Sequence, residues 1–189
     1  MNTRFLIIQF LSFLAWLFML VSYYRKNTNK ILVFQIMGNI TFCIHYLLLG
    51  AYSGLCICLI DAFCNIGYYK TDKDTLIYYI SIPFRIFAGI MSGESLIDVL
   101  PVCGSLVEGY SLTRDKKIVV IGGIITYSIW AIYDFSFMSY VGMIFDLIIV
   151  FSNIGILFRE YIFNNLVEWV YLLYYNIFVI GGLNAKTQK

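Results

Sequence analysis

The chain has 189 residues, of which 61% are hydrophobic and only 13% are charged, and its mean hydropathy is +0.82. Because a soluble domain carries about 25% charged residues, this composition excludes a water-soluble globular domain. It predicts an integral membrane protein that contacts the lipid bilayer. The net charge is only +2 and the basic residues are scattered in short loops, so no nucleic-acid partner is expected.

Seven apolar stretches are long enough to be membrane-spanning helices, which need roughly 17–25 residues. They are too long for barrel strands and do not alternate, so the predicted fold class is all-α and polytopic. In chain order, the predicted spans are 5–24, 31–49, 52–69, 76–91, 95–112, 118–133 and 139–158.

Lysine and arginine residues occupy alternate loops between these spans. Because basic residues are retained in the cytoplasm, this alternation predicts an N-terminus outside and the end of the seventh span inside. Only Arg4 lies on the opposite side, whereas the predicted cytoplasmic loops contain Arg25, Lys26, Lys30, Lys70, Lys73, Arg114, Lys116, Lys117 and Arg159.

The apolar stretch 162–180 also carries Asn164, Asn165, Glu168 and Asn176. After a turn back into the membrane, too few residues would remain for a comfortable span. Its Trp and Tyr side chains suit the headgroup level, so an interfacial helix is preferred over an eighth span.

An internal repeat with an offset of 88 residues relates FCNIG at 63–67 to FSNIG at 151–155 without a gap. Three spans on each side of a fourth, connecting span give two parallel three-helix repeats, a plan known among transporters. The predicted units are 1–69, the first repeat; 70–94, the connector; 95–158, the second repeat; and 159–189, the C-terminal helix and tail.

Polar side chains within the predicted spans are the candidate site, because such groups are costly in a bilayer. Asp61 and Asn65 share one face of the third span, and Asp146 and Asn153 share one face of the seventh. Asn65 and Asn153 are repeat mates, so we expect them to face each other across a cavity at equal depth. Each could instead bond only a neighbouring helix.

Four further residues complete the candidate site. Phe42 and Trp130, again 88 apart, are predicted to form its apolar walls. Arg85 in the fourth span needs a carboxylate partner, and Asp61 and Asp146 are available, so a structural ion pair is expected. Pro101 in the fifth span is a predicted hinge, because proline removes a helix hydrogen bond.

Catalytic and metal-binding patterns are missing from the sequence. It holds no HExxH motif, no phosphate-binding glycine loop and no nucleophile–base pair. The five cysteines lie in apolar stretches without zinc-type spacing, so no metal site and no cofactor are expected. We therefore do not expect an enzyme.

Three short blocks carry a resemblance to a known family. They are IHYLLLGAY at 44–52, LPVCGS at 100–105 and IYD at 132–134, and they resemble stretches of the YgjV-type bacterial inner-membrane proteins. The resemblance covers about residues 5–160 and implies a location in the bacterial cytoplasmic membrane. More distantly, the helix plan is similar to the SWEET, PQ-loop and PnuC transporters. In SWEET proteins an asparagine of the third helix and one of the seventh line the sugar site, which implies that role for Asn65 and Asn153.

The expected function is therefore transport or facilitated passage of a small, neutral, polar metabolite by alternating access between two three-helix bundles. The alternative is a non-transporting membrane scaffold or sensor. A transporter needs a hydrated cavity lined by the asparagine pair, whereas a scaffold packs these residues dry between helices. Homo-oligomerisation is left open by the sequence.

Overall fold

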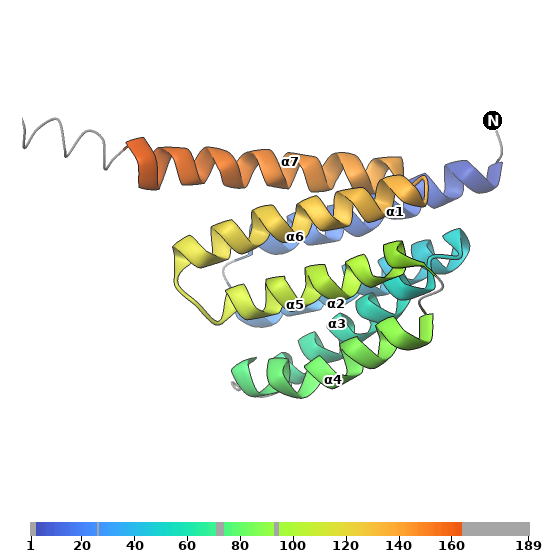
Figure 1. Cartoon of the computed structure of the whole chain (residues 1–189), viewed down its shortest axis with the longest axis horizontal. Helices are drawn as coiled ribbons and strands as arrows, with labels where there is room; N and C mark the ends of the chain where they lie inside the picture. Colours follow the sequence, from blue (N-terminus) through green and yellow to red (C-terminus); the bar gives the residue numbers. More distant parts are fainter. Residues whose placement is uncertain (1–2, 26, 71–73, 93–94, 164–189) are drawn as a thin grey trace, which may run out of the picture.

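A computed structural model describes residues 3–25, 27–70, 74–92 and 95–163 as an elongated bundle of helices lying side by side (Figure 1). The helices in chain order are α1 (Thr3–Tyr23), α2 (Thr28–Leu49), α3 (Tyr52–Lys70), α4 (Asp74–Ser92), the 3-10 helix η1 (Leu96–Val99), α5 (Leu100–Leu112), α6 (Lys116–Ser136), α7 (Tyr140–Leu157) and the π-helical turn η2 (Phe158–Phe163). The described residues contain no strand, as the all-α prediction requires.

Five of the described helices are long and apolar enough to cross a membrane. Their candidate spans are Thr3–Ser22, Thr28–Leu49, Thr75–Ser92, Lys116–Ser136 and Tyr140–Glu160. Large apolar side chains on their outer surfaces remain exposed, such as Phe10, Phe87 and Phe151, which suits contact with lipid chains. The predicted interfacial helix at 162–180 lies almost entirely outside the described residues.

The predicted fifth span differs from the observed chain. Residues 96–99 form a 3-10 turn, and α5 contains only 13 residues. At 1.5 Å per residue α5 is about 20 Å long, short of the roughly 30 Å apolar core of a bilayer. Pro101 stands in the first turn of α5, where its missing N–H would have no helical partner anyway. The expected hinge inside a continuous helix is therefore not found.

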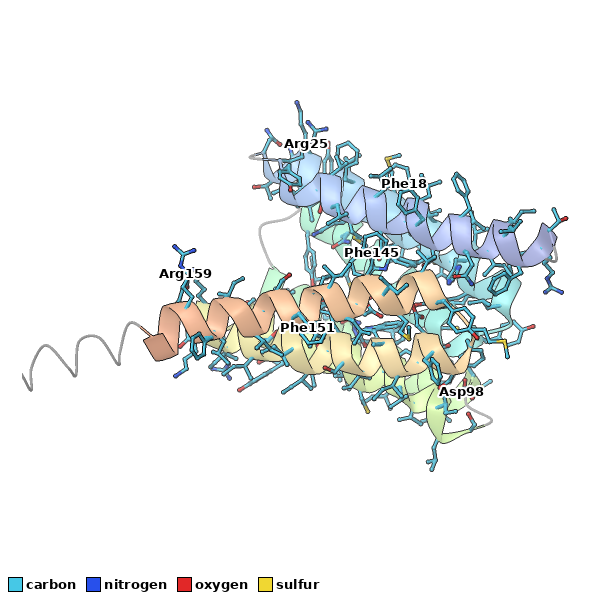
Figure 2. The ribbon with its side chains drawn as sticks, turned by 90° about the horizontal axis from the view of Figure 1, so that it is seen from above. Phe18, Arg25, Asp98, Phe145, Phe151 and Arg159 are labelled. Atoms are coloured by element: carbon cyan, nitrogen blue, oxygen red, sulfur yellow. The ribbon has the colours of Figure 1, made fainter. Side chains whose placement is uncertain are left out.

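The packing order of the helices is a closed ring. Consecutive helices pack within the groups α1–α2–α3 and α5–α6–α7, α3 contacts α5, and α7 contacts α1. Helix α4 packs outside this ring against α3 and α5. The aromatic side chain of Phe145 fills the space between α1 and α7 (Figure 2), where it stacks on Trp16 with 5.6 Å between ring centroids.

The 88-residue offset also relates details of local structure. Asn27 caps α2 by accepting a hydrogen bond from the Lys30 amide, and Asp115 caps α6 in the same way for Ile118. The turns that end these helices each contain a left-handed residue, Gly50 with φ 75° and Met138 with φ 59°. Glycine meets this demand freely, whereas methionine adopts it at a cost.

Basic residues gather at one end of the bundle. Arg25 after α1 and Arg159 after α7 lie at the same end, and Asp98 of η1 lies at the other (Figure 2). The turn between α5 and α6, which holds Arg114, belongs to the same end as Arg25 because successive helices run in opposite directions (Figure 1). We refer to these as the basic end and the opposite end of the bundle.

Candidate functional site

A polar cavity of about 190 Å³ lies among the helices and is the candidate site. It is smaller than the roughly 300–1,000 Å³ pockets of drug-sized ligands, so its size suits a small solute. All seven α-helices contribute to its lining, which consists of Trp16, Met19, Gln35, Asn39, Phe42, Tyr46, Cys58, Asp61, Cys64, Asn65, Tyr68, Tyr78, Arg85, Ser105, Glu108, Gly109, Leu112, Tyr127, Trp130, Asp134 and Asp146.

Connected aromatic rings form one wall of this cavity. Tyr46 stacks between Phe42 and Trp130, with centroid distances of 6.0 and 5.9 Å. Trp16 meets Phe42 edge-on at 5.8 Å and lies 6.1 Å from Tyr127. Phe42 and Trp130, the two walls predicted from the sequence, therefore line one cavity and are joined through Tyr46.

The ion pair of Arg85 stands on the side of the cavity nearest α4. Its Nη2 lies 2.6 Å from Oδ1 of Asp61, one of the two partners expected from the sequence. Its Nε donates to Ser81 Oγ at 3.1 Å, one helical turn earlier on α4. Its Nη1 is buried and has no partner among the described residues. The pairing explains how an arginine that is only 4% exposed is tolerated inside the bundle.

Three other carboxylates line the cavity. Asp134 accepts a hydrogen bond from the Tyr46 hydroxyl at 2.8 Å, and the Tyr127 hydroxyl lies 3.4 Å from Glu108. Asp146, which is 3% exposed, makes neither an ion pair nor a hydrogen bond with the part of the chain that the structure describes. No group of three His, Cys, Asp or Glu suited to a metal ion occurs among the described residues.

A network of buried hydrogen bonds closes the cavity at the opposite end of the bundle. His45, fully buried, lies 2.9 Å from the Ile8 carbonyl through Nδ1 and 2.9 Å from Ser139 Oγ through Nε2. Ser139 also donates to Asp134 at 3.1 Å. His45 of α2 thereby reaches the N-terminus of α7.

Tyr133 makes the corresponding bonds from α6. Its buried hydroxyl accepts from the Gly54 amide at 2.9 Å and lies 2.9 Å from Ser53 Oγ, which in turn donates to Asp98. Tyr133 thereby reaches the N-terminus of α3. His45 and Tyr133 are 88 residues apart. The bond of His45 to Ser139 runs from the group α1–α3 to the group α5–α7, and the bond of Tyr133 to Gly54 runs from α5–α7 back to α1–α3.

Positions related by the 88-residue offset converge on the cavity. Tyr46 and Asp134 are one such pair and bond each other directly. Four pairs in all line the cavity with both of their members: Asn39 and Tyr127, Phe42 and Trp130, Tyr46 and Asp134, and Cys58 and Asp146.

The structure does not place Asn65 and Asn153 in the same cavity, contrary to the expectation from the sequence. Asn65 lines the cavity, but Asn153 does not. The Asn153 amide instead packs on α6, so close to Gly123 that a β-carbon there would lie 2.6 Å from Nδ2. The position of α2 that corresponds to Gly123 under the 88-residue offset is Gln35, which lines the cavity together with Asn65. The expectation that both amides face each other across the cavity is therefore corrected.

Sequence reasoning also missed several lining residues. Gln35 and Asn39 are four apart within one predicted span, so the criterion of intramembrane polar groups could have found them. Glu108 was interpretable only as a residue near a helix end. Trp16 and Tyr46 carry no comparable signal, because aromatic residues are frequent throughout this chain.

The fold and the cavity together define a multi-pass membrane protein built around a buried polar site. Comparison with protein families identifies it further: the chain belongs to the Imp-YgjV family, described as bacterial inner membrane protein, which matches residues 6–162. The predicted membership is thus confirmed. Searches of curated proteins and of solved structures return no significant match.

Proposed function

We propose that this protein transports a small polar solute across the bacterial inner membrane, and that it is not an enzyme. The observation that carries the proposal is the central cavity, because it is polar, lies where two helix groups meet and is closed at one end only by side-chain contacts. Binding sites of secondary transporters lie at such interfaces between repeats.

The proposed machinery consists of two three-helix bundles, α1–α3 and α5–α7, with α4 as the connector. Support comes from the matched caps of α2 and α6, the matched left-handed turns, and the contacts α3–α5 and α7–α1, which are equivalent under exchange of the bundles. The first helices of both bundles run in the same direction, which supports parallel repeats in the proposed plan.

The described conformation fits one state of an alternating-access cycle. The cavity extends to Tyr68 and to Leu112, the last residue of α5, at the basic end. The crossed bonds of His45 and Tyr133 close the opposite end. Rocking the bundles apart at that end would exchange these few hydrogen bonds for water, which costs little net free energy per bond. The lining amides Gln35, Asn39 and Asn65 support a cargo with hydrogen-bonding groups.

Cysteine accessibility separates this transporter from a scaffold. In a cysteine-free background, a cysteine at position 65 is expected to react with a hydrophilic maleimide from the basic side, because it lines a hydrated cavity. A cysteine at position 153 is the matched control and is expected to stay unlabelled, since that side chain packs on Gly123. Equal protection of both positions would favour the scaffold.

The orientation of the chain makes a second prediction. The basic end is proposed to face the cytoplasm, because basic residues are retained there. Single cysteines at positions 27 and 115 are therefore expected to be labelled only after an impermeant reagent reaches the cytoplasmic side. A cysteine at position 52, in the first turn of α3, is expected to react from outside. Labelling of position 115 in intact spheroplasts would contradict this orientation.

A further inference from the structure

Asp146 carries a buried carboxyl group to which the described residues offer no basic partner, and the titratable groups that act on it are the carboxyls of Asp134 and Glu108. It is 3% exposed, it lines the cavity, and no described residue donates a hydrogen bond to it. An unpaired carboxylate inside a membrane protein is expensive, and such groups are normally paired or functional. A bound ligand with a positive charge would supply the missing partner.

The charge balance of the whole cavity points the same way. Four carboxylates line it, those of Asp61, Glu108, Asp134 and Asp146, against the single guanidinium of Arg85. Arg85 is committed to Asp61 at 2.6 Å, and the bonds to Asp134 come from uncharged hydroxyl groups. Because the cavity holds more carboxyl groups than basic groups, it favours a cation over an anion.

The aromatic wall identifies the kind of cation. Phe42, Tyr46 and Trp130 are stacked in series, and Trp16 and Tyr127 complete the wall. Aromatic faces attract cations, most strongly Trp, and groups of them recognise alkylated ammonium ligands. A metal cation such as Mg²⁺ or Ca²⁺ would instead need about six or more oxygen ligands. The described residues hold no group of three His, Cys, Asp or Glu suited to a metal ion, whereas the aromatic wall lines the same cavity as Asp146.

We infer that the cargo is a small organic cation, with an alkylated nitrogen placed between the Asp146 carboxylate and the aromatic wall of Trp16, Phe42, Tyr46, Tyr127 and Trp130. This inference rests on the proposed transport function and replaces the expected neutral metabolite with a positively charged one. The cavity of about 190 Å³ limits the cargo to a small molecule.

Binding to the purified full-length protein in nanodiscs tests the charge. The probes are tetramethylammonium and choline, with 3,3-dimethylbutan-1-ol as the neutral carbon isostere of choline. Calorimetry is expected to show choline binding at least about tenfold more tightly than the isostere, because ring and carboxylate both favour the charge. Asp146→Asn is expected to lower this preference severalfold without loss of thermal stability, since no described residue bonds to the carboxyl group that it replaces. Glu160→Gln, which removes an exposed carboxylate outside the cavity, is the matched control and keeps the preference.

The aromatic contribution is tested at Trp130. Trp130→Phe is expected to retain part of the choline affinity and Trp130→Leu to lose about tenfold or more, because leucine fills space but has no π-face. The inference is overturned if neither cation binds, if the isostere binds equally well, or if Asp146→Asn keeps the preference, as a protonated Asp146 would allow. Labelling at position 65 without cation binding would reject only the charge of the cargo, whereas an unlabelled position 65 would reject the transport function.

Discussion

Replacing Arg85 with methionine is expected to destabilise the folded protein by about 3–5 kcal/mol, among the largest effects of any single substitution in the chain. The reason is the ion pair with Asp61, in which Nη2 and Oδ1 are 2.6 Å apart. Methionine leaves the Asp61 carboxylate inside the bundle without its counter-charge. Because 27% of the Asp61 side chain remains exposed toward the cavity, the lower part of this range is expected.

A double-mutant cycle isolates the pair itself. Asp61→Asn combined with Arg85→Met is expected to cost less than the sum of the two single changes, because neither unpaired charge then remains. Unfolding in mixed micelles at increasing denaturant fraction gives the three free energies. Lys116→Met is the matched control, since it breaks an exposed ion pair with Glu160 and is expected to cost less than about 1 kcal/mol. Strict additivity for Asp61 and Arg85 would mean that the two charges are not coupled.

Replacing Gly142 with alanine is expected to destabilise the closed opposite end by about 1–3 kcal/mol. A β-carbon at Gly142 would overlap the Asp134 carboxylate and would lie 2.6 Å from Ser139 Oγ. Both groups belong to the network that holds His45, so they cannot move without breaking buried hydrogen bonds. The added methyl group would therefore clash with the residues whose hydrogen bonds close this end of the cavity.

The same helix supplies the control. Gly155, also in α7, has no atom within 4 Å of its would-be β-carbon. Gly155→Ala is expected to be neutral or mildly stabilising, because alanine is the better helix former by about 1 kcal/mol. Thermal unfolding of the two variants in the same detergent compares them directly. Equal stability of both would mean that the closure at Gly142 is loose enough to accept a methyl group.

The sequence predicted most of the helices well, because helix formation depends on local properties. Long apolar stretches separated by basic turns predict α1, α2, α4, α6 and α7 close to their observed bounds. The ion pair was foreseeable for the same reason: Arg85 has few carboxylates to choose from within apolar stretches. From the sequence alone, Asp61 and Asp146 were equally good partners for Arg85. The packing of α4 against α3 places Asp61 within reach of the guanidinium.

The remaining features depend on contacts between distant segments. The break before α5 follows from the Ser95–Asp98 capping contacts, in which Asp98 accepts from the Ser95 amide and hydroxyl. These bonds favour a turn where apolar composition alone favours a helix. Asn153 lies outside the cavity because its amide packs against Gly123 of α6, and the corresponding position of α2 is not a glycine but Gln35. The match between Asn65 and Asn153 in the repeat could not show that the residues at the second pair of positions, Gln35 and Gly123, differ.

The bond between Tyr46 and Asp134 limits how the two halves of this protein could have originated. At the axis of a dimer of identical subunits, each residue meets its own copy. An ancestral homodimer with aspartate there would bring two carboxylates together, which disfavours the ionised state of both. A hydroxyl donor opposite a carboxylate acceptor requires halves that differ in sequence. Under the proposed repeat plan, a single chain that contains both halves allows such a difference between them.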